Sequence, residues 1–404
     1  MKNEVKTVLQ KTELERLQGD FRVILKWATG VGKSKMAIEL VNAAIASIPK
    51  PMPKVVFIVA ERSHIQNWKD EFTKWGLKKA DISIMCYASL HKLRDTSLDI
   101  LVLDEAHHSF TEKRMSILET INAHYIYALS ATLSPAKIMD LESIFGKFTI
   151  STVTLKSAIE SSILPNPKVN IIEMTLDNTI PNQEITVGKG TNLPEVKWED
   201  RAKYIYKNIP CIIKCTEKQK YMYLTQTMEY WKERYQRSHN EFHHNRWVNL
   251  GSQRKRFIGE LKTNEVRKLI NTSLKNKRFI CFCSSVDQAI KLSSRNTISS
   301  RKPSYVNQAI IDSFNEKKIQ RLYAVGMATE GLNLKDIEVG VIVQLDGKER
   351  LFVQKFGRSL RAEDPVAYIF YYKDTQDEVY LKNALENIDN KFINHISTNL
   401  IKSA

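Results

Sequence analysis

The sequence lacks any apolar run long enough to cross a membrane. Its first residues, MKNEVKTVLQKTELERLQ, alternate charged and apolar side chains, so we expect no secretory leader and no membrane partner. Cysteine is scarce: five among 404 residues, an odd number that argues against a disulfide framework and fits a reducing cytosol. Neither Cys211/Cys215 nor Cys281/Cys283 has zinc-ligand spacing. Internal repeats and low-complexity tracts are also absent from the sequence.

Acidic residues are scarce relative to Lys and Arg in residues 201–280. The formal net charge is +16, and residues 201–280 alone carry 19 Lys/Arg against 6 Asp/Glu, a net +13. Tyrosine, tryptophan and phenylalanine are interleaved with these cations. Cations neutralise phosphates and rings stack on bases, so the pattern favours nucleic-acid binding. A helical subdomain with an aromatic core and a solvated basic rim is the alternative. The candidate contacts are Arg234, Arg237, Arg246, Arg254, Lys255 and Arg256.

A glycine loop, ATGVGKS, follows the apolar run Val23–Leu25 and leads into an amphipathic stretch, Met36–Ile48. Strand, glycine loop and helix in this order are typical of a nucleoside triphosphate site. The glycines let backbone N–H groups face the phosphates, and the helix N-terminus adds positive potential. Lys33 is expected to reach the β/γ-phosphates, and the Ser34 hydroxyl to bind Mg²⁺. The candidate ATP-binding residues are Thr29, Gly30, Val31, Gly32, Lys33 and Ser34.

A second apolar run, Ile100–Leu103, ends in the carboxylates Asp104 and Glu105. Parallel sheets gather functional groups at the carboxyl ends of their strands. We therefore expect Asp104 to hold Mg²⁺, and Glu105 to orient and deprotonate the attacking water. A strand that simply runs into an acidic turn is the alternative, and the glycine loop upstream disfavours it.

Two further patterns complete the set. The apolar run Tyr125–Leu129 ends in Ser130, Ala131 and Thr132. Far downstream, residues 354–361 read QKFGRSLR, and on a helix Arg358 and Arg361 share a face. Two guanidinium groups aimed at one phosphate suit the arginine-finger role.

ATGVGKS, DEAHH, SAT and QKFGRSLR, in that order, resemble motifs I, II, III and VI of superfamily 2 helicases. The resemblance is closest to the DEAD/DEAH-box group that includes type III restriction subunits and phage helicases. Weaker similarities to motif Ia, the TYxSL element, motif IV and motif V occur at Ala60–Arg62, Cys86–Leu90, Arg278–Ser285 and Thr329–Leu334. Together the motifs extend from Ala28 to Arg361.

The resemblance implies that ATP and Mg²⁺ lie between two domains. It implies that His107 contacts Gln354 across that cleft, and that Ser130 and Thr132 couple the phosphate state to domain position. The implied hydrolytic residues are Glu105, Gln354, Arg358 and Arg361, and the implied nucleic-acid contacts outside the basic segment are Arg62, Ser89 and Thr329. The glutamine that reads adenine stays open between Gln10 and Gln18.

Strands that alternate with helices predict an α/β fold of two RecA-like parallel-sheet domains with a mostly helical basic insertion. The first group of strands is expected at Val23–Leu25, Val55–Val59, Ile82–Tyr87, Ile100–Leu103 and Tyr125–Leu129, and the second at Phe279–Phe282, Leu322–Val325, Gly340–Leu345 and Ala367–Tyr371. The expected division is an ATP-binding domain at 1–155, a linker with one irregular strand (Val169–Met174) at 156–200, the insertion at 201–275 and the second domain at 276–404.

These expectations define a nucleic-acid-dependent ATPase: a helicase or translocase, with DNA as the expected polymer. A nucleic-acid clamp or remodeller that uses ATP as a switch, without processive unwinding, is the alternative. A P-loop ATPase that acts on proteins is a third reading, which SAT and GRSLR disfavour. We expect a monomer in the cytoplasm of a prokaryotic or phage-infected cell, with replication or repair proteins as partners. These last expectations rest on analogy.

Overall fold

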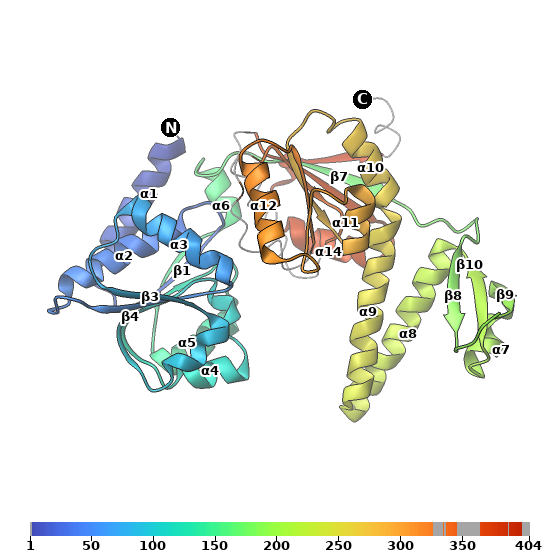
Figure 1. Ribbon diagram of the computed structural model, residues 1–404, viewed down its shortest axis with the longest axis horizontal. Helices are drawn as coiled ribbons and strands as arrows, with labels where there is room; N and C mark the ends of the chain where they lie inside the picture. The colour runs from blue at the N-terminus through green and yellow to red at the C-terminus, as the bar shows by residue number, and fades with distance from the viewer. Residues whose placement is uncertain (1, 326–333, 335–336, 346–363, 387, 398–404) are drawn as a thin grey trace.

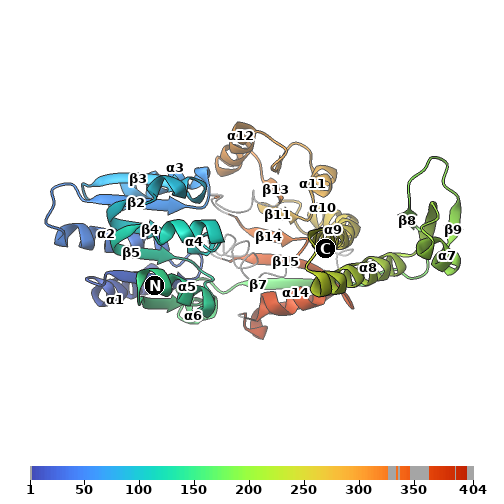
Figure 2. The same ribbon diagram turned by 90° about the horizontal axis from the view of Figure 1, so that it is seen from below.

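The structure is a computed structural model that describes residues 2–325, 334, 337–345, 364–386 and 388–397. Two α/β domains and a projecting arm lie in a row, and the arm stands on the side of the second domain that faces away from the first (Figures 1 and 2). Both large sheets are parallel, with helices packed on them. The predicted fold class of two RecA-like domains with an insertion is therefore confirmed.

The first domain is a six-stranded parallel sheet in the order β3-β2-β4-β5-β1-β6. All five strands expected here are present, and the short β6 at the edge is an addition. Strands β2 and β4 are almost wholly apolar and buried, as a sheet covered on both faces requires. The strands are β1 (Arg22–Trp27), β2 (Lys54–Val59), β3 (Asp81–Cys86), β4 (Ser97–Leu103), β5 (Asn122–Leu129) and β6 (Thr149–Val153). The helices are α1 (Lys2–Leu17), α2 (Lys33–Ser47), α3 (Arg62–Trp75), α4 (Glu112–Leu118), α5 (Pro135–Phe145) and α6 (Leu155–Glu160), with 3₁₀ turns η1 (Tyr87–Leu93) and η2 (Ala106–His108).

The second domain is a seven-stranded parallel sheet in the order β12-β13-β11-β14-β15-β7-β16. Its strand β7 comes from the segment expected to be a linker, and it lies between β15 and β16. The strands are β7 (Lys168–Met174), β11 (Phe279–Cys283), β12 (Thr297–Ile298), β13 (Arg321–Val325), β14 (Val339–Ile342), β15 (Val366–Tyr372) and β16 (Ile393–Ser397). The helices are α10 (Thr263–Asn271), α11 (Val286–Leu292), α12 (Ser304–Asn315) and α14 (Gln376–Leu385), with the 3₁₀ turn η5 (Asn390–Phe392).

The domain boundaries therefore differ from those expected at 156–200 and 201–275. The first of these segments supplies α6 to the first domain, β7 to the second and two strands to the arm. Its Pro- and Asn-rich composition favours irregular structure locally, but Ile171 pairs with Ile369, almost 200 residues further along the chain. Pairing over that separation leaves no local signal in the sequence.

The arm is inserted between β7 and α10. It consists of a long antiparallel hairpin of α8 (Glu217–Ser238) and α9 (Glu241–Leu261) beside a small three-stranded sheet in the order β8-β10-β9. The small sheet buries Ile185, Cys211 and Cys215 in its own core, which gives both cysteines a packing role. Its remaining elements are β8 (Gln183–Val187), β9 (Glu195–Lys197), β10 (Cys211–Cys215), α7 (Arg201–Tyr206) and the 3₁₀ turn η3 (Trp198–Asp200).

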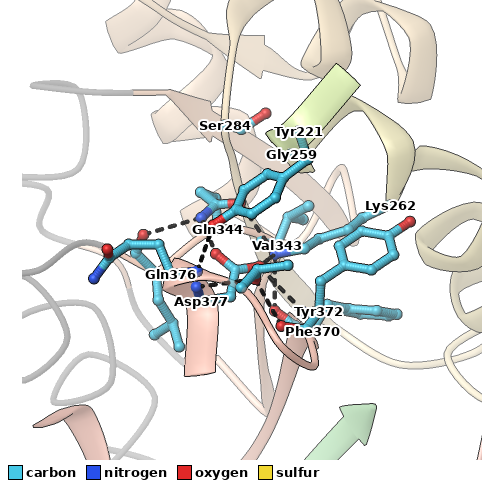
Figure 3. Close-up of polar contacts among 12 residues, drawn as sticks. Tyr221, Gly259, Lys262, Ser284, Val343, Gln344, Phe370, Tyr372, Gln376 and Asp377 are labelled. Atoms are coloured by element: carbon cyan, nitrogen blue, oxygen red, sulfur yellow. Dashed lines mark hydrogen bonds and ion pairs between the residues drawn. The ribbon is translucent and has the colours of Figure 1, made fainter. Parts of the chain in front are cut away.

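A buried ion pair fixes the root of the arm to the second domain (Figure 3). Lys262, directly after α9, has no exposed surface and lies 2.5 Å from Asp377 of α14. Its ammonium also donates to the carbonyls of Val343 and Phe370 and to the side chain of Gln344. These partners stand at or just beyond the carboxyl ends of β14 and β15, so one lysine joins three elements of the domain to the arm.

The other helix of the arm reaches the same place. The Tyr221 hydroxyl of α8 accepts a hydrogen bond, 2.8 Å long, from the backbone N–H of Gln376 (Figure 3). Gly259 of α9 packs so closely on Ser284 that a Cβ there would lie 2.4 Å from that side chain. Both helices are thus held where α14 begins and β11 ends.

Among the helices that the structure describes, none is long and apolar enough to cross a membrane. The described histidines, cysteines and acids form no cluster of three that could hold a metal ion.

Candidate ATP site and nucleic-acid contacts

Three of the sequence motifs meet at one edge of the first sheet. The glycine loop follows β1, Asp104 and Glu105 follow β4, and Ser130 follows β5. These three strands are neighbours in the order β4-β5-β1, and all are parallel. Their carboxyl ends therefore place the three motifs side by side, as the sequence predicted.

The glycine loop has the geometry of an anion cradle. Gly30 and Gly32 have φ of +93° and +103°, a region that side chains disfavour. A Cβ on Gly32 would also lie 2.3 Å from the Gln10 amide nitrogen. Gly32 is the N-cap of α2, and no side chain caps that helix end. The N-terminal end of α2 carries positive potential at this loop, and a phosphate suits it.

Helix α1 covers this loop. Lys6 Nζ donates to the Gly30 carbonyl at 2.8 Å, and Gln10 Nε2 donates to the Val31 carbonyl at 3.1 Å. Gln10 is buried on the loop, whereas Gln18 is exposed just past the end of α1. Of the two glutamines left open by the sequence, Gln10 is the one that touches the phosphate-binding loop.

Lys33 and the two carboxylates form one electrostatic unit. Lys33 Nζ donates to the Trp27 carbonyl at 2.9 Å and acts on both acids through its charge. Burial, with repulsion from Glu105, raises the pKa of Asp104 to about 6. Trp68 Nε1 of α3 donates to Asp104 Oδ2 at 2.8 Å. The pKa of Glu105 moves the opposite way: burial opposes its ionisation, but the His107 hydrogen bond and the charge of Lys33 outweigh that effect.

This electrostatic pattern fits Mg²⁺ beside Asp104. Burial and the charge of Glu105 raise the pKa of Asp104 despite the charge of Lys33, and the oxygen of a carboxylate is a preferred Mg²⁺ ligand. Asp104 and Ser34 would hold the ion, which when bound neutralises charge on the phosphates. Glu105 stays ionised near neutral pH, the state that a water-orienting base requires.

A short relay leads from Glu105 to the SAT motif. His107 Nδ1 lies 3.3 Å from Glu105 Oε2 and 3.3 Å from Ser130 Oγ. Ser130 Oγ in turn accepts the Thr132 N–H at 3.2 Å. His107 and Ser130 are both buried. The relay gives the predicted coupling residues a direct connection to the predicted catalytic base.

The predicted nucleic-acid contacts fall into two groups. Arg62 follows β2 and is exposed, and Ser89 follows β3, so both extend the same edge of the first sheet. On the arm, Arg234, Arg237, Arg246 and Arg256 are exposed, and Lys255 is partly buried. Arg254 differs: it is 8% exposed, stacks over Tyr221 and donates to Thr225, so it packs α9 against α8.

Four predicted residues lie outside the described part of the structure. They are Thr329, Gln354, Arg358 and Arg361, so the His107–Gln354 contact also lies outside it. Their assignments stay predictions from the motifs.

Sequence reasoning missed two residues of this site, Lys6 and Trp68. Lys6 is one of many lysines in a charged helix, and nothing in its spacing marks it. Trp68 belongs to an amphipathic helix, where the pattern predicts that an apolar ring packs in the core. Its indole N–H nevertheless donates to Asp104. Both act through tertiary contacts alone.

Comparison with known proteins supports the same interpretation. Residues 2–89 match the family model of the type III restriction enzyme res subunit, and residues 261–363 match that of the helicase conserved C-terminal domain. The second match begins where the arm ends. The sequence has no significant match among curated proteins.

Solved helicase structures share the fold. Saccharomyces cerevisiae Dbp5 bound to RNA and ADP BeF3 is similar at a TM-score of 0.59 and 11% identity, over 98% of this chain and 92% of that one. A Dbp5 variant bound to the same ligands has a TM-score of 0.62 and 11% identity, over 97% of this chain and 90% of that one. The Pyrococcus furiosus Hef helicase domain has a TM-score of 0.51 and 14% identity, over 92% of this chain and 96% of that one. The motif geometry and the two family models support a superfamily 2 helicase that resembles type III restriction subunits, and the solved structures show that the chain has the fold of such helicases.

Proposed function

We propose that this protein hydrolyses ATP to move along or unwind nucleic acid, and that its polymer is DNA. The observation that carries the proposal is the relay from Glu105 through His107 to Ser130, built beside an anion cradle. A base for hydrolysis is thus joined to the motif that reports the phosphate state. Its family consists of nucleic-acid-dependent ATPases and helicases, which supports this use of the site.

In this proposal ATP lies between the two domains. Lys33 and the loop amides hold the phosphates, Glu105 orients the water, and Arg358 and Arg361 of the second domain complete the site. Binding closes the domains and hydrolysis reopens them, and each cycle shifts the grip on the polymer. Arg62, Ser89 and Thr329 contact that polymer's backbone.

The setting is also a proposal. We infer a monomer that works in the cytoplasm of a prokaryotic or phage-infected cell. Proteins of replication or repair are its partners in this view.

The test is ATPase activity with no polymer, single-stranded DNA, duplex DNA and RNA, measured separately. DNA should stimulate turnover most, and Glu105→Gln protein should show none under any condition. Stimulation by RNA alone would overturn the choice of DNA, and equal turnover with and without polymers would overturn nucleic-acid dependence.

A strand-displacement assay on the stimulating polymer then separates the two mechanisms. Displacement that requires hydrolysis supports a motor. Polymer-stimulated hydrolysis with tight ATP-dependent binding and no displacement or translocation would instead support the switched clamp.

A further inference from the structure

A groove runs along the arm, between the α8–α9 hairpin and strand β8. Its volume is about 810 Å³, and it lies beside the hairpin face that carries Tyr223 and Trp231 of α8. Strand β8 contributes Glu184, Ile185 and Thr186 to the opposite wall. The arm stands on the far side of the second domain from the ATP site (Figure 1), so this groove is separate from that site.

One stripe of α9 supplies four of the hydrogen-bonding side chains that line the groove and one aromatic ring. Phe242, Arg246, Asn249, Gln253 and Arg256 follow one another at intervals of four and three residues, so they share a helix face. All five line the groove and all are exposed. The distance from Arg246 to Arg256 is ten helical residues, or about 15 Å. That length covers a few nucleotides of an extended strand.

The tip of the stripe is aromatic. Phe242 is 55% exposed, and its ring meets Trp231 edge to face, with the centroids 5.6 Å apart. The Arg246 guanidinium lies 5.3 Å from the Phe242 centroid. A large exposed ring held by a second ring and beside a cation offers a base a flat apolar surface next to a phosphate partner.

The charge of the groove favours a polyanion. Between Glu241 and Glu260 the sequence of α9 has no acidic residue, and two of its four cations, Arg246 and Arg256, line the groove. On the facing wall, Glu184 is paired with Lys214 at 2.5 Å. Asparagine and glutamine between the arginines can donate and accept, which suits base edges as well as phosphates.

The groove also continues toward the second domain. A neighbouring hollow of about 750 Å³ shares Lys220, Gln253 and Arg256 with it and extends to Arg267 of α10 and Lys291 of α11. Lys291 is paired with Glu260 at 2.9 Å, so Arg267 is the cation that a strand leaving the groove meets on the second domain.

We propose that this groove binds single-stranded nucleic acid, with a base stacked on Phe242 and phosphates on Arg246 and Arg256. A single strand is the occupant because stacking on a side chain needs an unpaired base, which a duplex does not offer. This inference rests on the proposed function. It gives the nucleic acid a second binding site on the arm, in addition to the contacts proposed for Arg62, Ser89 and Thr329.

The experiment measures binding of a fluorescent oligo-dT to the full-length protein without nucleotide, across a range of salt. Phe242→Ala should weaken binding about 5- to 100-fold, the usual effect of losing one base–ring stack. The matched control is Val248→Ala, another exposed apolar residue of α9 that does not line the groove. Arg246→Glu/Arg256→Glu should lower the log–log salt slope by about 1.4, at about 0.7 per phosphate on a single strand.

A charge-matched control keeps the second test specific. Lys207→Glu/Lys218→Glu changes two exposed arm lysines outside the groove, and it should leave the slope close to that of the parent. Circular dichroism and thermal melts verify that each variant is folded.

The outcomes separate this site from the proposed function. If the parent protein binds DNA and is stimulated by it, but the groove variants match their controls, the groove proposal fails and the motor stands. Stronger competition by duplex DNA or polyglutamate than by oligo-dT would likewise overturn the single strand as occupant. A parent protein that neither binds nor responds to any polymer would overturn the proposed function itself.

Discussion

At the scale of single residues, Asp104 and Glu105 show how two adjacent acids acquire different roles. Asp104 is desolvated beside another negative charge, and its pKa rises to about 6. Glu105 has His107 as a hydrogen-bond partner, and its pKa falls. The pair titrates as a unit, and the proton that it takes up first goes to Asp104. The residues predicted to bind Mg²⁺ and to orient the attacking water are thus adjacent but differ in pKa.

Asp104→Asn should stabilise the protein while it abolishes Mg²⁺-dependent hydrolysis. A carboxyl with a raised folded-state pKa binds its proton more tightly when folded, so stability falls as pH rises from about 4 to about 6 and stays lower above. Because asparagine cannot ionise, the free energy of unfolding of the variant should exceed that of the parent by about 1–3 kcal/mol at pH 7. At pH 4 the two proteins should be equally stable. Denaturant melts without Mg²⁺ at both pH values measure the difference. An equal gain at pH 4 would point to packing instead of charge.

Glu105→Gln should stop ATP turnover and leave ATP affinity nearly unchanged. The glutamine keeps the shape of the side chain but cannot take a proton from water, and Lys33, Ser34 and Asp104 remain in place. Single-turnover hydrolysis and equilibrium binding of a fluorescent ATP analogue separate the two effects. Turnover within a few-fold of the parent would show that another group is the base.

At the scale of elements, the root of the arm depends on the Lys262–Asp377 ion pair. Burial lowers the pKa of Lys262, and Asp377 offsets this in part. Lys262 has no exposed surface, and four acceptors surround its amino group there. Such a pair stabilises little by itself but costs much when one partner is removed.

Lys262→Met should therefore destabilise the protein by about 3–5 kcal/mol, because Asp377 is left buried without its counterion. Adding Asp377→Asn should recover part of that loss, which a double-mutant cycle from denaturant midpoints measures. Lys268→Met is the matched control: Lys268 is an exposed lysine of α10 paired with Glu265, and its loss should cost at most about 1 kcal/mol. A double variant that loses the sum of both single losses would contradict coupling between Lys262 and Asp377.

The strands of both sheets differ in how well the sequence predicts them. Long apolar runs such as Ile100–Leu103 and Phe279–Cys283 are strands because both sheet faces are buried there. The edge strands β6, β12 and β16 are short or mixed in composition, and the sequence analysis missed them. The motifs at the strand ends could be predicted because their chemistry requires local spacing. Gln10 on the loop and Lys262 at the root could not be assigned, because only tertiary packing gives them their partners.

At the scale of the whole molecule, the proposed mechanism draws on residues of both domains. Arg358→Ala and Arg361→Ala, changes in the predicted second-domain motif, should each reduce hydrolysis on the order of 10³-fold, the effect of an arginine finger. DNA affinity without nucleotide should stay nearly unchanged. Steady-state ATPase and nucleotide-free binding test the two halves of this prediction. Equal losses in both would make these arginines part of the polymer track.

The placement of β7 has a consequence for how the chain folds. The first domain is complete by Glu160 and the arm is continuous in sequence, so each can fold as its residues leave the ribosome. The second domain cannot: β7 must wait for β15 and β16, made about 200 and 220 residues later, and such high contact order slows folding. Until then the apolar β7 has both edges unpaired and is prone to aggregation. The nascent protein thus holds a folded nucleotide-binding half and a folded arm well before it has a second domain to join them.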